Sequence, residues 1–237
     1  MRHRHGVVAR PGRPRAPRAA LARLVTEGGA PAASLLTEDP SGTRYLAVGP
    51  PLRRADHFRA GSVTKTFVAT VVPQLAAEGR LRLDDRVDRY LPGLVRGHGN
   101  DGRRLTLRSL LSHTNGLFNY TADTTVPVAL GPGEAIRTAL AQSPGRLGTY
   151  AYSNTNYVLL GQIIQAVTGR AYAVEITRRV INPLHLTGAS LPGARTTLPE
   201  PHSRAYTSNG RDVTELDPRE AGASGEPIST LADLSRF

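Results

Sequence analysis

Two apolar segments with helical periodicity constrain the fold of this sequence most strongly. In residues 62–78 the apolar side chains recur every three or four positions up to Gly79, and residues 156–168 show the same pattern up to Gly169. This spacing places apolar side chains on one face of an α-helix, and a glycine just after the last turn is typical of a helix C-terminus. Pro73 lies inside the first segment and predicts a kink there. We therefore expect two long apolar helices.

Shorter elements surround these two helices. Residues 106–112 and 171–181 have helical patterns, whereas residues 32–36 and 44–48 are typical of two strands joined by the Asp-Pro-Ser-Gly turn at 39–42. Helices dominate the middle of the chain, and strands occur only near its start. The sequence therefore predicts an α+β fold in which a helical lobe is inserted into an antiparallel sheet lobe.

The net charge of +11 is unevenly distributed. Residues 1–18 contain six arginines and three prolines but no acidic residue. This composition is typical of an extended, solvated segment, whereas residues 19–27 have helical composition. We expect residues 1–18 to form a basic tail and residues 19–237 to form one domain. Within that domain, residues 19–60 would contribute to the sheet lobe and residues 61–237 would be mainly helical.

Composition excludes several classes of protein. The chain has no cysteine, so it forms no disulfide and no thiolate zinc site. Its seven histidines lack metal-ligand spacing, and we expect no metal site. No stretch approaches the roughly 20 apolar residues that span a bilayer. The longest apolar run of the tail, residues 7–9, is too short for a signal peptide, and the tail carries no nucleic-acid-binding motif, so no specific nucleic-acid partner is expected.

Lys65 is the single lysine among 30 Lys and Arg residues. An arginine stays protonated near neutral pH, whereas a lysine desolvated in a pocket can lose its proton and act as a base. Ser62 precedes Lys65 by three residues, and residues i and i+3 share one face of a helix. The unpaired N–H groups at a helix start also favour a developing oxyanion. Ser62 is therefore our candidate nucleophile and Lys65 its activating base.

Tyr152 and Asn154 form a second candidate pair. In an extended segment, residues i and i+2 point the same way, so both side chains can enter one pocket. A tyrosine near positive charge can relay a proton, and an asparagine can donate a hydrogen bond to a substrate carbonyl. The alternative interpretation places Tyr152 in the core and Asn154 at the cap of the next helix.

Together these segments resemble the penicillin-recognising serine hydrolases, specifically the serine D-alanyl-D-alanine carboxypeptidases and the class C β-lactamases. The resemblance covers about residues 45–237, in the family's order and spacing. The matching stretches are residues 58–67 with the S-x-x-K motif, 83–85, 90–92, 110–117, 152–157 with the Y-x-N motif, 183–184 and 229–234.

The resemblance implies a β-lactamase/transpeptidase-like fold and an acyl-enzyme mechanism without a cofactor. Ser62 would be acylated, Lys65 and Tyr152 would share the proton transfers, and Asn154 would hold the substrate. The implied substrates are D-alanyl peptides, β-lactams and small esters, and the context of Tyr152 favours the carboxypeptidase reaction. The family also suggests an extracytoplasmic or secreted protein.

The sequence also departs from the family. The third motif of the family, His/Lys-x-Gly, would follow residues 229–237 and is not present here; residues 202–204 lack its glycine. We therefore expect a sheet lobe that is incomplete at the C-terminus and a pocket without its second oxyanion donor. His113 is not expected to be a triad base, because its position looks structural in the family and no G-x-S-x-G motif is present. The alternative to an active hydrolase is a truncated, catalytically silent relative that acts at most as a binding module.

Overall fold

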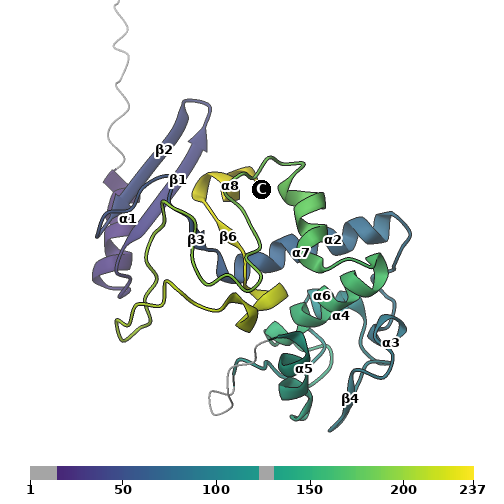
Figure 1. The fold of residues 1–237 in the computed structure, drawn as a ribbon. Coiled ribbons are helices and arrows are strands. Elements are labelled where there is room, and N and C mark those ends of the chain that lie inside the picture. Colours follow the sequence, from purple (N-terminus) through teal and green to yellow (C-terminus); the bar gives the residue numbers. More distant parts are fainter. Residues whose placement is uncertain (1–14, 123–130) are drawn as a thin grey trace, which may run out of the picture.

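The computed structural model describes residues 15–122 and 131–237 (Figure 1). Its α-helices are α1 (Arg15–Thr26), α2 (Thr64–Ala77), α3 (Val87–Tyr90), α4 (Leu107–Leu111), α5 (Pro132–Leu140), α6 (Asn154–Thr168), α7 (Tyr172–Ile176) and α8 (Leu231–Arg236). Its strands are β1 (Ala33–Asp39), β2 (Gly42–Val48), β3 (Phe58–Arg59), β4 (Arg96–Gly97), β5 (Asn100–Asp101) and β6 (Ile228–Ser229). Short 3₁₀ turns form η1 (Gly61–Val63), η3 (Pro218–Glu220) and η4 (Gly222–Ser224), and a π-helical turn forms η2 (Thr177–Ile181). Within these described ranges, no helix combines the length and apolar character needed to cross a membrane.

A β-hairpin with a helix beside it forms the N-terminal part of the described chain (Figure 1). Strands β1 and β2 pair antiparallel along their whole length. The Asp39 carboxylate accepts a hydrogen bond from the Ser41 backbone N–H at 2.7 Å, which supports the tight turn between them. The predicted hairpin is therefore confirmed. Helix α1 begins at Arg15, so residues 15–18 belong to a helix that was predicted to begin at residue 19, and residues 1–14 of the predicted tail lie outside the described residues.

Strand β3 ties the start of α2 to the C-terminal part of the chain. It pairs antiparallel with β6, with Phe58 opposite Ser229. Helix α8 follows β6 and brings the ring of Phe237 onto that of Phe67 in α2, with the ring centroids 4.2 Å apart. In the described ranges each sheet has two strands, β1–β2, β3–β6 and β4–β5. Strands and helices thus combine in an α+β architecture, with α2 and α6 on one side of β3 and β6 and the hairpin on the other (Figure 1).

The core lies where α2 and α6 meet. Both helices contribute side chains with no solvent exposure: Val68, Val71, Val72 and Leu75 from α2, and Leu159, Leu160, Ile163 and Ile164 from α6. Burying one such side chain contributes roughly 1.5–3 kcal/mol relative to leaving it exposed. The two predicted apolar helices are confirmed, although α6 begins at Asn154, ahead of its predicted start. Helix α2 continues through Pro73, whose side chain is exposed.

The two shorter predicted helices differ in outcome. Helix α4 is capped by Thr106, whose side chain accepts a hydrogen bond from the Ser109 backbone N–H at 3.1 Å, while the Ser109 hydroxyl accepts one from the Thr106 N–H. The helix predicted at residues 171–181 is instead α7 followed by the π-helical turn η2. The hydrophobic periodicity did not reveal the change from an α-helix to a π-helical turn, because the buried residues of both elements face the same core.

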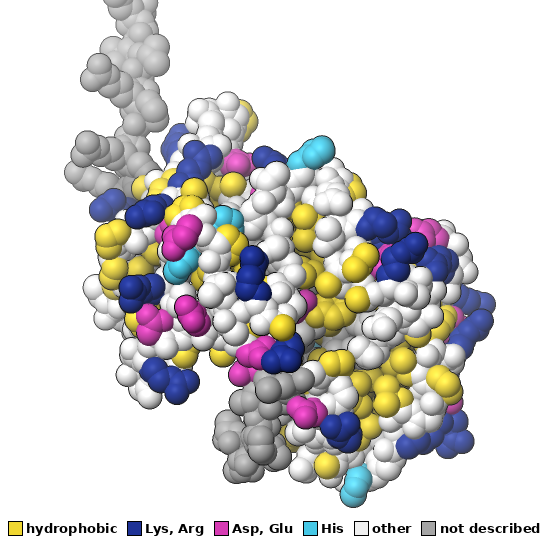
Figure 2. Space-filling model, viewed as in Figure 1, with side chains coloured by type: hydrophobic (Ala, Val, Ile, Leu, Met, Phe, Trp, Pro, Cys, Tyr) yellow, Lys and Arg dark blue, Asp and Glu magenta, His cyan; other side chains and the backbone are white. Residues whose placement is uncertain are grey.

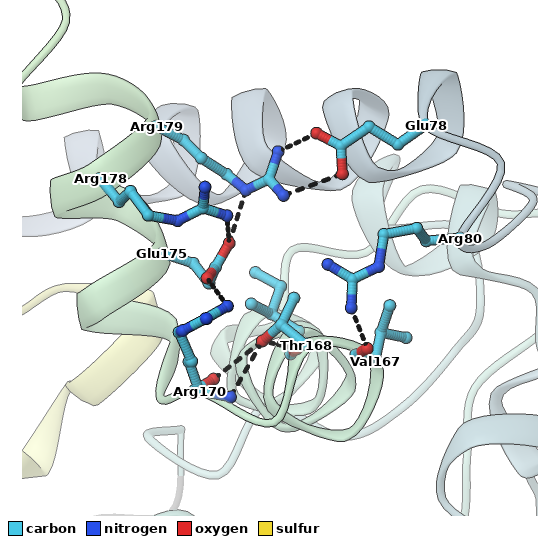
Figure 3. Close-up of polar contacts among 9 residues, drawn as sticks. Glu78, Arg80, Val167, Thr168, Arg170, Glu175, Arg178 and Arg179 are labelled. Carbon is cyan, nitrogen blue, oxygen red and sulfur yellow. Dashed lines mark hydrogen bonds and ion pairs between the residues drawn. The ribbon is translucent and has the colours of Figure 1, made fainter.

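Glu175 of α7 carries a fully buried carboxylate (Figure 3). Its oxygens lie 2.5 Å from Arg179 Nε, 2.9 Å from Arg178 Nη2 and 3.6 Å from Arg170 Nη1. Arg179 also pairs with Glu78 at the end of α2, at 2.9 Å. Burial acts to raise the pKa of Glu175, but the hydrogen bonds from Arg178 and Arg179 outweigh it and hold the pKa below its usual value. This cluster joins α7 to the end of α2, and both of its carboxylates have arginine partners.

The surface carries charges of both signs, and it also has a groove. On the face shown in Figure 2, Lys and Arg side chains are spread across the molecule, with Asp and Glu side chains among them. A groove of about 680 Å³ separates the hairpin from β3, and its lining includes Ser34 of β1 and Phe58 of β3. The charge of the visible face is thus distributed rather than gathered into one basic patch.

Candidate active site

Ser62 lies between a strand and a helix. Strand β3 ends at Arg59, and Gly61 has a φ of 53°, in the left-handed region that favours glycine. The chain then enters η1 and α2, so Ser62 lies at the start of a helical segment and is exposed. The first N–H groups of a helix lack intrahelical acceptors and carry partial positive charge. Negative charge that develops at Ser62, or on a substrate oxygen beside it, is therefore stabilised here.

Lys65 is buried beside Ser62, with 6% of its surface exposed. Its Nζ lies 3.1 Å from Ser62 Oγ and donates to Asn154 Oδ1 at 2.7 Å and to the Ser224 carbonyl at 2.8 Å. All three acceptors are neutral, and no carboxylate in the described part of the chain forms an ion pair with Lys65. Burial lowers the pKa of Lys65, although its interaction with Tyr152 acts in the opposite direction.

Tyr152 contacts Ser62 from the segment that precedes α6. Its hydroxyl lies 2.7 Å from Ser62 Oγ, and either oxygen can be the donor. The centroid of its ring lies 4.8 Å from Lys65 Nζ, within the range of a cation–π interaction. Tyr152 is 42% exposed, so its phenol can reach a molecule bound at Ser62. The serine oxygen therefore has two neighbouring groups that can take its proton.

Asn154 enters the site from the first turn of α6. Ser153, with φ −147° and ψ 122°, is the extended N-cap residue, and Asn154 is already helical. This corrects the extended geometry predicted for Tyr152 and Asn154, and it places Ser153 rather than Asn154 at the cap. Asn154 Oδ1 faces Lys65, while its Nδ2 donates to Thr121 Oγ1 at 2.9 Å. The amide is thus held with its oxygen towards the lysine.

Ser224 is a site residue that sequence reasoning missed. Its main-chain carbonyl, in η4, accepts a hydrogen bond from Lys65. Turn η4 packs against α6 at Gly161, where an added Cβ would lie 2.7 Å from the Ala223 side chain. A backbone acceptor leaves no pattern of residue types in a sequence, because every residue has a carbonyl. The close packing of η4 on α6 is what brings this one to Lys65.

His113 is buried beside Tyr152, with the two ring centroids 4.7 Å apart. Its Nδ1 accepts a hydrogen bond from the Ser153 backbone N–H at 3.2 Å and lies 3.0 Å from Asn156 Nδ2. Burial lowers the pKa of His113, and the positive charge of Lys65 adds to this effect. These hydrogen bonds fix the segment that carries Tyr152 and do not involve the candidate nucleophile. They agree with the expectation that His113 is structural.

The four predicted site residues therefore converge on one point, although they come from two segments far apart in the sequence. Their functional groups are a hydroxyl, an amine, a phenol and an amide, all within hydrogen-bonding distance of a neighbour in the set. Within residues 15–122 and 131–237, no group of three or more His, Asp or Glu side chains has the arrangement of a metal site. The set suits nucleophilic acyl transfer.

A serine that contacts both a buried lysine and a tyrosine, at the start of a helix in an α+β fold, defines a class of acyl-transfer sites. The model of the Beta-lactamase family matches residues 17–237, and the chain belongs to this family. The resemblance found in the sequence and the predicted fold class are both confirmed.

The chain is similar over most of its length to several known proteins. Penicillin-binding protein 4 of Amycolatopsis lactamdurans is 31% identical over an alignment of 240 positions, and the match covers 90% of this chain and 60% of that protein. The structure of a D-stereospecific amidohydrolase from Streptomyces sp. is 40% identical with a TM-score of 0.85, and the match covers 93% of this chain and 71% of that one. The D-amino acid amidase of Ochrobactrum anthropi SV3 is 27% identical with a TM-score of 0.79, over 93% and 66% of the two chains. The chain thus spans 60% of the length of the penicillin-binding protein.

Proposed function

We propose that this protein is a serine hydrolase that forms an acyl-enzyme through Ser62. The observation that carries the proposal is the contact of Ser62 with Lys65, a buried lysine whose hydrogen-bond acceptors are all neutral. Loss of its proton removes a buried charge that has no counter-ion, so Lys65 can be neutral at a pH where an exposed lysine is charged. Neutral Lys65 then accepts the Ser62 proton.

In the acylation step, Ser62 Oγ attacks the carbonyl carbon of an amide or ester as its proton passes to Lys65. The new C–O bond leaves a negative charge on the former carbonyl oxygen, which the N–H groups at the start of the helix stabilise. The Tyr152 hydroxyl, 2.7 Å from Ser62 Oγ, donates a proton to the leaving amine or alcohol as its bond to carbon breaks. Lys65 returns its extra proton to Tyr152.

In the deacylation step, water attacks the ester carbonyl of the acyl-enzyme. Tyr152 or Lys65 accepts the proton of the water, and the same proton returns to Ser62 Oγ when the acid leaves. Asn154 would orient the substrate in both steps. Asn154 Nδ2 donates a hydrogen bond to the Thr121 hydroxyl, so Asn154 must give up this bond before Nδ2 can donate to a substrate carbonyl.

Amides and esters with a D-configured acyl residue are the proposed substrate class, with D-alanyl-D-alanine carboxypeptidase activity as the first reaction to test. The similar proteins support this class, because one is a D-stereospecific amidohydrolase, one a D-amino acid amidase and one a penicillin-binding protein. β-Lactams and simple esters are the alternatives, since the same nucleophile and proton carriers can serve all of these substrates.

The test is intact-protein mass spectrometry after exposure to benzylpenicillin and to a reactive ester. We expect a mass gain of one acyl group, mapped to the peptide that contains Ser62, and no gain in Ser62→Ala. Turnover of D-alanyl-D-alanine peptides and of D- and L-phenylalanine amide then ranks the substrates, with the D-configured compounds expected to react faster. A folded protein that stays unmodified by every probe would favour the catalytically silent binding module.

A further inference from the structure

The segment that supplies Ser224 to the active site also borders a separate cavity. The cavity has a volume of about 380 Å³, and its lining includes Ala135 of α5, Val158 of α6, Tyr172 of α7 and Glu226. Ser62, Lys65, Tyr152 and Asn154 are not among its lining residues. A volume of this size and a mainly apolar wall with a few polar groups are typical of small-molecule sites.

Glu226 is the acidic side chain in this wall, and 4% of its surface is exposed. The Tyr172 hydroxyl donates a hydrogen bond to Glu226 Oε1 at 2.7 Å. No basic side chain in the described residues pairs with Glu226, and Arg219, the basic residue of the cavity wall, pairs with Asp217 at 2.6 Å. Burial raises the pKa of Glu226, against the effect of the Tyr172 hydrogen bond.

Glu175 is another buried carboxylate, and its partners differ from those of Glu226. Three arginines surround it, so its charge is matched within the chain (Figure 3). Glu226 is almost as deeply buried but has one neutral donor, and a buried carboxylate without a counter-ion is costly. The cavity beside Glu226 is where a counter-ion can enter.

We propose that this cavity binds a small organic cation, with an apolar group among Ala135, Val158 and Tyr172 and a primary ammonium group on the Glu226 carboxylate. An ammonium group brings three N–H donors and a positive charge to an acceptor that has one donor. Because Glu226 lies two residues from Ser224, whose carbonyl accepts from Lys65, the ligand would contact the segment that holds the candidate base. The binding itself does not depend on the acyl-enzyme chemistry.

The test is calorimetric titration of benzylamine into the full chain carrying Ser62→Ala, a variant that cannot be acylated at that serine. We expect saturable binding at one site. Benzyl alcohol has nearly the same shape without the charge, and it should bind about tenfold more weakly or less. Glu226→Gln should weaken benzylamine binding by about tenfold or more and leave benzyl alcohol unaffected.

Two further variants keep the test decisive. Ala173→Leu places a larger side chain of α7 in the cavity and leaves the Glu226 carboxylate unchanged, so it should abolish benzylamine binding. This variant tests the proposal if Glu226→Gln does not melt cooperatively. Glu38→Gln removes an exposed carboxylate on β1 and should leave binding unchanged. The absence of saturable binding, equal binding of benzylamine and benzyl alcohol, or unchanged affinity in both cavity variants would overturn the proposal.

Discussion

Glu175 and Lys65 are both buried charged side chains, but their surroundings are opposite. Glu175 is enclosed by Arg170, Arg178 and Arg179 (Figure 3). Lys65 has a hydroxyl, an amide oxygen and a backbone carbonyl as its acceptors. The arginines hold the pKa of Glu175 below its usual value, whereas burial lowers the pKa of Lys65. The carboxylate is therefore kept charged, and the lysine is pushed towards its neutral form.

The difference separates a group that ties two helices together from one that, in the proposed mechanism, contributes to reactivity. The matched charges around Glu175 connect α7 to Glu78 at the end of α2 through Arg179. The unmatched charge of Lys65 lies at the other end of α2, next to the candidate nucleophile. Burying a charge without a counter-ion is costly, so the buried amine is pushed towards the neutral form that can accept a proton.

The largest expected effect is that of Lys65→Arg on acylation. Arginine keeps the positive charge but cannot accept a proton, so the acylation rate should fall by about 10²–10⁴-fold, towards the complete loss expected in Ser62→Ala. The rate is measured by mass spectrometry with a penicillin or a reactive ester, on protein whose melt shows that it is folded. An arginine variant that keeps more than about a tenth of the wild-type rate would remove Lys65 from the base role.

Glu175→Gln should instead lower stability. It leaves Arg179, which is itself buried, without one of its two carboxylate partners, and breaking a buried ion pair typically costs roughly 3 kcal/mol. Urea denaturation measures the free energy of unfolding. The acylation rate of the folded fraction should stay close to that of the wild type. A variant with normal stability but slow acylation would break the contrast between the two buried charges.

The pH dependence of stability tests the lowered pKa of Lys65 directly. Between its folded pKa and its usual value of 10.5, Lys65 binds more protons in the unfolded than in the folded protein. The penalty for burying its charge is therefore complete below the folded pKa and is relieved as the pH rises through this window. We expect the free energy of unfolding of the wild type to rise with pH relative to that of Lys65→Met. A difference between the two proteins that is independent of pH would mean that the pKa of Lys65 is not shifted.

The smallest effect is expected at an exposed ion pair. Arg108 Nε lies 2.8 Å from Asp84 Oδ1, and both side chains are more than half exposed. Solvent and salt screen such a pair, so Asp84→Asn should change neither the melting temperature nor the acylation rate measurably. If this variant were as unstable as Glu175→Gln, burial would not be the property that distinguishes the two ion pairs.

Contacts between residues close in the chain were predictable from the sequence. Ser62 and Lys65 are three residues apart at the start of a helix, and this spacing is enough to bring Nζ within 3.1 Å of Oγ. The Thr106 cap and the hairpin turn are local in the same way. Tyr152 and Asn154 became candidates through their short motif and through the family resemblance, because nothing in their spacing points to Ser62.

The tertiary structure alone decided how the distant residues meet. Lys65 contacts Asn154 and Ser224, which lie 89 and 159 residues away in the chain, and it does so because α6 begins at Asn154 and η4 packs on α6. The same holds for Glu175, whose pairing with Arg179 extends to Glu78 on another helix. Periodicity identifies the face of a helix that is buried, but not the element that covers it. The sequence by itself singled out Lys65 as the candidate base, and the packing of α2, α6 and η4 decided its surroundings, because burial and the partners of the amine set its pKa.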